Sequence, residues 1–252
     1  MNHQSYTTKM IADSIGVHVN TLRFYEESGL ITKPARQYNG YRIYTDLQLD
    51  QCKLIRKIMQ AEVLQNGLRA KAIQMIRLLA GLNFDGASVA IDEYCQIIDA
   101  EIINAQAAVI AVERILHNAA PPDSAVLRRH EVAQALDVTP ETLRTWERNG
   151  LIAPSRSKNG YRTYGAMDME RLNMIRTLRC ANYSLSAILR LLNGLDRNEV
   201  SSVEAVLNTP CQEDDIISVC DQLLVSLRNA KENAHEVMDM IKKMKEKYTT
   251  LQ

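Results

Sequence analysis

Residues 20–31 read NTLRFYEESGLI and residues 141–152 read ETLRTWERNGLI, so one stretch of sequence occurs twice. A second stretch follows each copy, YNGYRIY at 38–44 and KNGYRTY at 158–164. The copies lie 121 positions apart in the first stretch and 120 in the second. A repeat of this length is a whole domain, because solenoid units span only ~20–50 residues. The chain of 252 residues therefore carries two copies of one module.

Each copy begins with apolar residues at helical spacing on both sides of a tight turn. Gly16 marks this turn in the first copy, and Asp137 stands at its position in the second. Thr139–Pro140 is typical of the start of a helix. The threonine hydroxyl can accept a hydrogen bond from a free backbone amide of the first turn, and proline at the first helical position lacks only an amide that would have no partner there. Gly29 and Gly150 are placed to end the two helices. The pattern predicts a helix-turn-helix in each module.

Each helix-turn-helix is followed by Asn-Gly and then Tyr-Arg-x-Tyr. Asn-Gly predicts a hairpin, with either a two-residue turn or a longer wing loop. A helix-turn-helix with a wing is typical of proteins that place a helix in the major groove and hold phosphates beside it. The alternative is a small helical domain with an incidental hairpin, which the recurrence of the basic positions in both copies disfavours.

The side chains expected to contact DNA form matched sets. The candidates on or next to the recognition helices are His18, Asn20, Thr21, Arg23 and Tyr25, and Thr139, Glu141, Thr142, Arg144 and Trp146. The candidates on the wings are Arg36, Tyr41 and Arg42, and Arg156, Tyr161 and Arg162. The aromatic residues among them could face either DNA or the module core. Asparagine can bind an adenine edge whereas glutamate can only accept, so we expect the modules to prefer different bases and an imperfect inverted repeat.

This combination resembles the MerR family of bacterial transcription regulators. The resemblance lies in V-x-x-x-TLRFYE-x-x-GLI from Val17 and GYR-x-Y from Gly40, and covers 4–80 and 125–195 with the helices after each. The second copy departs from the family pattern at Asp137 and at Thr145–Trp146. The resemblance implies promoter DNA as the ligand, distortion of a promoter that lets RNA polymerase start, and a long helix that pairs antiparallel with its copy.

The net charge of the chain is zero, but its basic and acidic residues are unevenly distributed along the sequence. Residues 1–80 contain 11 Lys and Arg residues and 6 Asp and Glu residues, and residues 125–195 contain the same numbers. The intervals are acidic, with 1 against 7 in 81–124 and 7 against 11 in 196–252. Two basic modules therefore alternate with two acidic segments, and local rather than total charge governs phosphate binding.

Each acidic segment contains an apolar seam with alternating spacings of three and four. The first seam is Cys95, Ile98, Ile102, Ala105, Val109, Val112 and Leu116, and the second is Ile216, Cys220, Leu223, Leu227, Ala230, Ala234, Val237, Ile241 and Met244. Such spacing is typical of a coiled coil, although each helix could instead pack on its own module. We expect a mainly α protein with these two helices paired antiparallel within the chain.

The expected domains are a first module at 1–80, a first coiled-coil helix at 81–117, a linker at 118–124, a second module at 125–195 and a second coiled-coil helix at 196–252. Because covalent linkage gives the second helix an effective concentration of order mM, an internal pair should form in preference to one with another chain. A single-chain pseudo-dimer is the first expectation, and a homodimer with four modules is the second.

Other classes of function receive less support. There is no Ser/His/Asp arrangement or phosphate loop, so we expect no enzymatic activity and no cofactor. The five cysteines lack the clustering of a metal site, and we expect free thiols. Without a signal peptide or a run of ~18 apolar residues, we expect a cytoplasmic protein with no membrane partner. A small-molecule-sequestering protein on the same scaffold, or an excisionase-like architectural factor, remains an alternative, and an effector is unknown.

Overall fold

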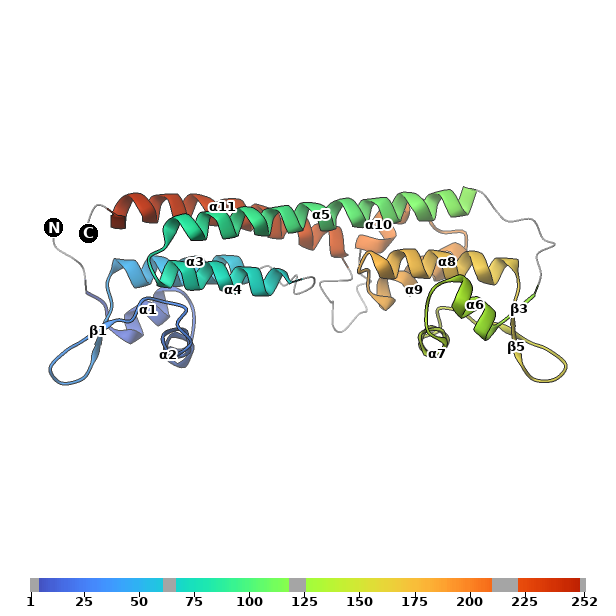
Figure 1. Ribbon diagram of the computed structural model, residues 1–252, viewed down its shortest axis with the longest axis horizontal. Helices are drawn as coiled ribbons and strands as arrows, with labels where there is room; N and C mark the ends of the chain where they lie inside the picture. Colours follow the sequence, from blue (N-terminus) through green and yellow to red (C-terminus); the bar gives the residue numbers. More distant parts are fainter. Residues whose placement is uncertain (1–4, 61–66, 118–125, 210–221, 250–252) are drawn as a thin grey trace. The chain divides into compact units, whose positions relative to one another are not determined.

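The computed structural model describes residues 5–60, 67–117, 126–209 and 222–249, and most of them are helical (Figure 1). By their internal contacts the residues divide into two compact units. The first unit comprises Met1–Ala100 with Leu227–Gln252, and the second comprises Glu101–Ser226. Each unit holds one copy of the repeated sequence, so the sequence repeat is also a structural one.

The first unit begins with the predicted helix-turn-helix. Its helices are α1 (Thr8–Ser14) and α2 (Val19–Glu27). Gly16 in the turn has a φ of +64°, a left-handed conformation that glycine adopts without steric cost. Ile11 on α1 and Leu22 on α2 are completely buried, which fixes the inward face of each helix and leaves the opposite face of α2 to solvent.

The wing of the first unit is a short antiparallel hairpin of β1 (Ala35–Arg36) and β2 (Arg42–Ile43). The backbone amide of Gln37 donates to the carbonyl of Tyr41 at 2.8 Å, which closes a three-residue loop, 38–40. The glycine of this loop has a φ of +84°. The Asn-Gly pair therefore forms part of a three-residue loop with glycine in the left-handed position, and not a two-residue turn.

Two further helices, α3 (Asp46–Met59) and α4 (Leu68–Ala80), complete the first module. A buried glutamine joins them to the chain that leaves the recognition helix. Gln51 is 1% exposed, and its amide donates to the carbonyl of Leu79 at 2.9 Å and to the hydroxyl of Thr32 at 2.8 Å. Because all of these polar groups have partners, the network stabilises the position of α2 on its supporting helices.

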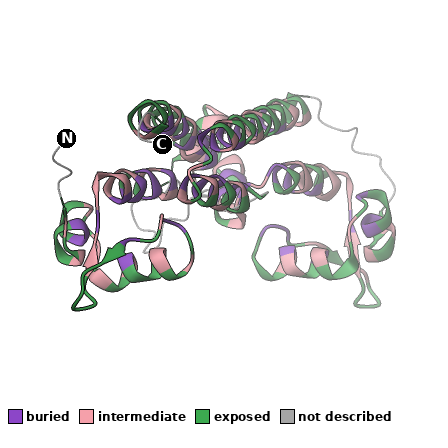
Figure 2. Cartoon of the chain, turned by 60° about the vertical axis from the view of Figure 1, so that its left-hand side comes forward, coloured by how far each residue is buried: buried purple, intermediate pink, exposed green. Residues whose placement is uncertain are grey.

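Segments of the two long helices pack against each other within the first unit. These helices are α5 (Phe84–His117) and α11 (Leu223–Thr249). Lys245 contacts Asp85 at 2.5 Å, and Lys231 contacts Asp99 at 2.6 Å. The earlier aspartate pairs with the later lysine, so the two segments run antiparallel, and Figures 1 and 2 show them side by side.

The apolar seam of α11 is buried as expected. Its described members are all buried: Leu223, Leu227, Ala230, Ala234, Val237, Ile241 and Met244. Ile216 and Cys220 lie outside the described residues. The α11 segment also contacts the first module, because Lys57 of α3 pairs with Glu236 at 2.7 Å and Tyr248 donates to Asp50 at 2.7 Å. The C-terminal helix of the chain thus packs on the N-terminal module.

The second unit repeats the module, and the pairing that precedes its first helix, a single bridge between Tyr6 and Tyr44 in the first unit, is extended here to a strand. Its elements are β3 (Leu127–Arg128), α6 (Arg129–Ala135), α7 (Pro140–Arg148), β4 (Ser155–Arg156), β5 (Arg162–Tyr164), α8 (Ala166–Cys180) and α9 (Leu185–Asp196). Strand β5 pairs with β4 as in a wing and also with β3, which gives three strands. Asp137 has a φ of +51° and so takes the conformation of the glycine it replaces. Ser184 caps α9, accepting from the amide of Ala187 at 2.9 Å.

The second half of α5 belongs to the second unit. Tyr183, which precedes α9, donates from its hydroxyl to the carbonyl of Ala105 at 3.4 Å, and Asn182 donates to Glu101 at 3.1 Å. Ala105, Val109 and Val112 of the first seam are buried here, whereas Ile102 is half-buried and Leu116 is exposed; of the seam residues in the first unit, Ile98 is buried and Cys95 is half-buried. The first long helix therefore packs on the second module along much of its predicted seam.

The segment between α9 and α11 differs from the predicted continuous helix over 196–252. Asn198 has a φ of +56°, which ends the helical path after α9. A separate helix, α10 (Val203–Asn208), then begins behind Ser202, whose hydroxyl accepts from the amide of Ala205. Within the described residues, α11 begins only at Leu223. The predicted linker, 118–124, lies outside the described residues.

One property of α5 needs a structural explanation. By length and composition alone this helix could cross a membrane, with a mean hydropathy of 1.4 over its most apolar stretch. In the first unit, however, its Ile91, Tyr94 and Ile98 are buried, and Asp85 and Asp99 form ion pairs with lysines. Packing against other helices accounts for these residues, whereas 28% of the most apolar stretch is buried and Ile103 and Ile110 are exposed.

Candidate nucleic-acid interface

The outer face of α2 carries polar and aromatic side chains in solvent. Asn20 and Arg23 are exposed, and Phe24 is 59% exposed, although it is large and apolar. Among the described residues, Arg23 has no hydrogen bond or ion pair. Thr21 is half-buried. The face can therefore offer an amide, an unpaired guanidinium and an apolar ring to a ligand, a set that can contact both phosphates and base edges.

Two of the predicted contact residues are also helix caps. The His18 ring accepts from the amide of Asn20 at 3.2 Å, and the Thr139 hydroxyl accepts from the amide of Thr142 at 3.1 Å. These side chains satisfy helix N-terminal amides that would otherwise lack partners. The first copy is therefore capped by His18, at the position that Thr139 occupies in the second copy.

The aromatic residues at matched positions are not equivalent. Trp146 is only 4% exposed and packs in the core of the second module, the second of the two places expected for it, so its ring offers little surface to a ligand. Burial of its large apolar ring stabilises the second module. Tyr25, the matching residue, is half-buried, and burial raises the pKa of its hydroxyl. The structure thus assigns the two aromatic positions mainly to the module interior and leaves Phe24 as the aromatic residue on the outer face.

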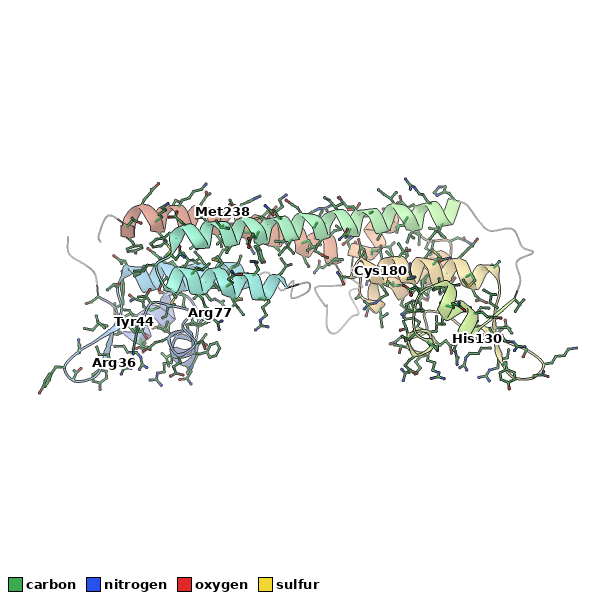
Figure 3. All side chains as sticks on the ribbon, in the orientation of Figure 1. Arg36, Tyr44, Arg77, His130, Cys180 and Met238 are labelled. Atoms are coloured by element: carbon green, nitrogen blue, oxygen red, sulfur yellow. The ribbon has the colours of Figure 1, made fainter. Side chains whose placement is uncertain are left out.

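A buried carboxylate joins the recognition helix to the wing in the first module. The side chain of Glu26 is 7% exposed and accepts a short hydrogen bond from Arg42 Nε. Arg36 also approaches Glu26, at 3.7 Å. The hydrogen bond from Arg42 to Glu26 raises the pKa of the Arg42 guanidinium. Figure 3 shows Arg36 on the wing and Tyr44 at its base, nearer the body of the module.

The second module has a more extensive form of the same contact. Glu147, 9% exposed, contacts Arg162 Nε at 2.6 Å and Arg129 Nη2 at 2.8 Å, and it accepts from the Tyr164 hydroxyl at 2.6 Å. Burial alone would raise the pKa of Glu147, but the hydrogen bonds from Tyr164 and Arg129 outweigh it, and the pKa is lowered. The carboxylate is therefore ionised at neutral pH and is held by three donors.

These contacts change the role expected for the wing arginines. We predicted that Arg42 and Arg162 would clamp phosphates, but both direct Nε at a carboxylate of their own module. An arginine in this position fixes the wing against the recognition helix, and only its remaining donors are available to a ligand. Tyr41 and Tyr161 are 71% and 72% exposed, so their side chains remain available to a ligand.

Several exposed residues near this surface were not among the sequence candidates. Tyr38 is completely exposed in the first wing loop, and Lys158 occupies the matching position of the second. Arg148 lies seven residues after Glu141 on the same face of α7, a spacing that could have revealed it. Beside α7 lies a groove of about 590 Å³ whose lining includes Arg176 and Arg179 of α8. These two arginines could be grouped with α7 only once the packing was known.

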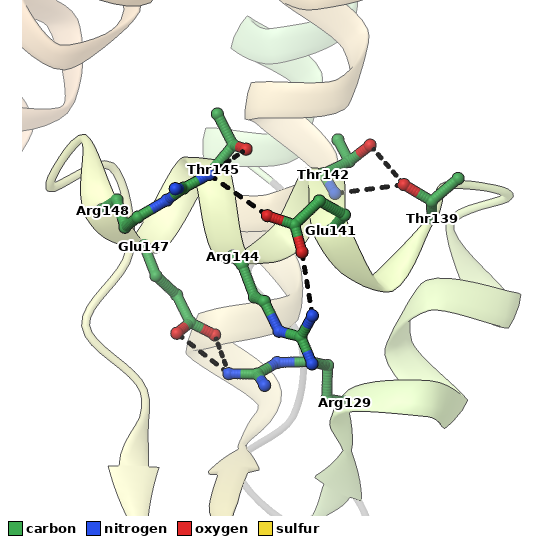
Figure 4. Close-up of polar contacts among 8 residues, drawn as sticks. All are labelled: Arg129, Thr139, Glu141, Thr142, Arg144, Thr145, Glu147 and Arg148. Atoms are coloured by element: carbon green, nitrogen blue, oxygen red, sulfur yellow. Dashed lines mark hydrogen bonds and ion pairs between the residues drawn. The ribbon is translucent and has the colours of Figure 1, made fainter.

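The exposed face of α7 carries an ion-pair network centred on Glu141 (Figure 4). Arg144 Nη1 lies 2.8 Å from one carboxylate oxygen, and Arg148 Nη2 lies 3.2 Å from the other. Arg148 also donates to the Thr145 hydroxyl at 3.1 Å. The hydrogen bond from Arg144 lowers the pKa of Glu141. The second recognition helix therefore presents two arginines that share a single counter-charge.

The cysteines do not gather into a site in the described part of the chain. Cys52 is buried, and burial raises the pKa of its thiol to about 12, so it stays protonated. Cys95 is half-buried, and its pKa is raised by burial and by Asp92 and Asp99. Within the described residues, no group of three or more His, Cys, Asp or Glu side chains could hold a metal ion. Cys211 and Cys220 lie outside those residues.

Comparison with known families explains why the geometry occurs twice. Residues 7–44 match the model described as MerR family regulatory protein, and residues 127–195 match the one described as MerR HTH family regulatory protein. Both regions belong to the MerR family. The resemblance predicted from the sequence is thereby confirmed for each module, and the MerR-family modules coincide with the two helix-turn-helix and wing structures.

Relatives of the MerR-family modules are regulators by name. The HTH-type transcriptional regulator CueR of Salmonella typhi is 44% identical over 50 residues, which is 20% of this chain and 36% of that protein. The mercuric resistance operon regulatory protein of Bacillus cereus is 39% identical over 70 residues, 27% of this chain and 53% of that protein. The chain thus spans between about a third and a half of the lengths of these two relatives.

A solved structure also matches part of the chain. It is the crystal structure of HiNmlR, described as a MerR family regulator lacking the sensor domain, bound to promoter DNA. The match covers 54% of this chain and 92% of that one, with 21% sequence identity and a TM-score of 0.25.

Proposed function

We propose that this chain is a transcription regulator that binds duplex DNA in a sequence-specific manner, with its two MerR-family modules reading the two halves of one operator. The observation that supports this most directly is the exposed face of each recognition helix beside a wing with an exposed tyrosine. In this arrangement the helix would enter the major groove, and the wing would contact the neighbouring backbone. The activity is binding rather than catalysis.

The proposed assembly is a single-chain pseudo-dimer. It is supported by the antiparallel packing of α11 on α5 and on the first module, which uses helices of the same chain. An ordinary homodimer of this chain would present four modules and remains the competing assembly. RNA polymerase would be the partner at the promoter, a small-molecule effector is unidentified, and the expected compartment is the cytoplasm.

The operator would be an imperfect inverted repeat. Asn20 can take an adenine edge and exposed Phe24 can contact a thymine methyl group, whereas the matching residues in α7 are Glu141 and Thr145. Two different recognition faces should prefer two different half-sites, because operator symmetry mirrors protein symmetry.

Selection from random duplexes, followed by sequencing, tests this proposal directly. We expect enrichment of a site with two unequal half-sites, and a gel shift of the selected duplex by the purified full chain. A perfect palindrome as the best site would contradict the asymmetric reading. Failure to enrich or shift any duplex would contradict DNA binding, and affinity for a small molecule alone would instead support the sequestering alternative.

A further inference from the structure

The two recognition helices differ most in whether their exposed arginines are paired with a carboxylate. On α7, Glu141 lies between Arg144 and Arg148 and contacts both, at 2.8 and 3.2 Å. All three side chains are exposed, by 59%, 55% and 69% respectively. The network therefore lies on the surface that would meet DNA if the proposed function holds, and it is not part of the module core.

The first recognition helix lacks this arrangement. Asn20 occupies the position of Glu141, and Arg23, three residues later, has no ion pair within the described residues. Glu27 stands at the position of Arg148. Thus α2 presents one guanidinium, that of Arg23, and has no carboxylate at the position of Glu141. Helix α7 presents two guanidiniums that are already paired with a carboxylate.

We propose that Glu141 lowers the affinity of the second module for DNA of arbitrary sequence by holding Arg144 and Arg148, and so makes α7 the more discriminating recognition helix. This inference rests on the proposed function. To contact a phosphate or a guanine, each arginine has to leave the carboxylate or share it with a second anion. The carboxylate itself is then brought towards the phosphates, and this like-charge approach is unfavourable.

The same carboxylate can become favourable at a suitable base pair. Glutamate accepts a hydrogen bond from the amino group of cytosine in the major groove, and an arginine freed from it can bind the neighbouring phosphate or a guanine. Only a half-site with a cytosine amino group at this position provides a hydrogen bond that compensates for bringing the negative charge close to the phosphates. Residues that penalise wrong partners more than the right one are a general source of specificity, and Glu141 is suited to this role.

The test compares a selected operator with a random duplex for the wild-type chain and Glu141→Gln. Glutamine keeps the size of the side chain and removes its charge. We expect affinity for the random duplex to rise by up to about fivefold, the range that an exposed ion pair can account for, and affinity for the operator to rise less or to fall, so that the ratio decreases. The log–log salt slope on random DNA should steepen by up to ~0.9, because one more positive charge is then uncompensated.

The matched change in the first module is Asn20→Glu, which places a carboxylate three residues before Arg23. It should weaken binding to random DNA and flatten the salt slope, the opposite of Glu141→Gln. Thermal unfolding of both variants should stay close to that of the wild type, since both positions are exposed. Opposite shifts in the two modules support a role for the charge at this position of the recognition helix.

A third variant tests whether Glu141 acts through the arginines. In an Arg144→Ala/Arg148→Ala background, Glu141→Gln should change the affinity for random DNA much less than in the wild type, because the residues it holds are gone. An undiminished effect would overturn the inference, because it would leave only the direct repulsion between the Glu141 carboxylate and the phosphates. An unchanged operator-to-random ratio in Glu141→Gln would also overturn it while leaving DNA binding intact. Absence of wild-type binding to any duplex would instead reject the proposed function, and this inference with it.

Discussion

Arg162 on the second wing directs its Nε at the buried carboxylate of Glu147 on the recognition helix, 2.6 Å away. The same relationship holds in the first module, where Arg42 contacts Glu26. In each case the carboxylate lies on the second helix of the helix-turn-helix and the arginine on the hairpin. The pair therefore fixes the angle between the two parts that are proposed to contact DNA.

Replacing Glu147 with glutamine should destabilise the second module by about 1–3 kcal/mol, because two arginines and a tyrosine lose their ionised acceptor in a largely buried place. Differential scanning calorimetry should show a lower transition temperature. Glu141→Gln, the same change on the exposed face of the same helix, is the matched control and should have little effect on the transition. Equal shifts in the two variants would show that burial of Glu147 is unimportant.

The stabilising effect of Glu147 should depend on pH. Its pKa in the folded protein lies below the usual 4.5, so its contribution is complete above that pH and is lost as the pH falls through the lowered value. The difference in stability between the wild type and Glu147→Gln should therefore be largest near neutral pH and shrink in acid. Urea unfolding at several pH values measures this. A difference that grows in acid would contradict the assignment.

Removing the unpaired arginine of the first recognition helix should weaken binding to DNA and flatten its salt dependence. If Arg23 contacts one phosphate, Arg23→Ala should reduce the log–log slope by about 0.9. Lys243→Ala removes an exposed charge on α11 and serves as the control, with an unchanged slope expected. Fluorescence anisotropy over a range of salt concentrations distinguishes these outcomes, and an unchanged slope for Arg23→Ala would remove this residue from the interface.

A charge on the buried seam of α11 should destabilise the first unit. Val237 is completely buried, and an unpaired glutamate there should cost several kcal/mol. His235, two residues away, is exposed, so His235→Glu should be tolerated. Circular dichroism during thermal unfolding compares the two variants. Equal stability would mean that α11 does not depend on this seam.

The proposed pseudo-dimer predicts the mass in solution. Sedimentation at low micromolar concentration should give one chain, 28.5 kDa. The reason is that the seam of α11 is already occupied by helices of its own chain in the first unit. A mass of two chains that persists on dilution would favour the homodimer.

Local sequence signals identified the modules well, because they report on interactions between near neighbours. Thr139 caps its helix as predicted, since a cap needs only a hydroxyl a few residues before the amide it binds. Asp137 departs from the family glycine, yet it takes the same left-handed backbone, which aspartate tolerates better than most side chains. The MerR-family resemblance rested on such local patterns and was confirmed for both modules.

The sequence by itself thus determined the repeat, the helix-turn-helix and wing of each module, and the apolar seams of the long helices. Tertiary structure alone decided that Trp146 is buried, that Arg42 and Arg162 contact carboxylates, and that α11 packs on the first module. Helical spacing shows that residues share a face but not what that face meets. The partner of a seam or an arginine lies far away in the chain, and only the packing of the helices brings the two together.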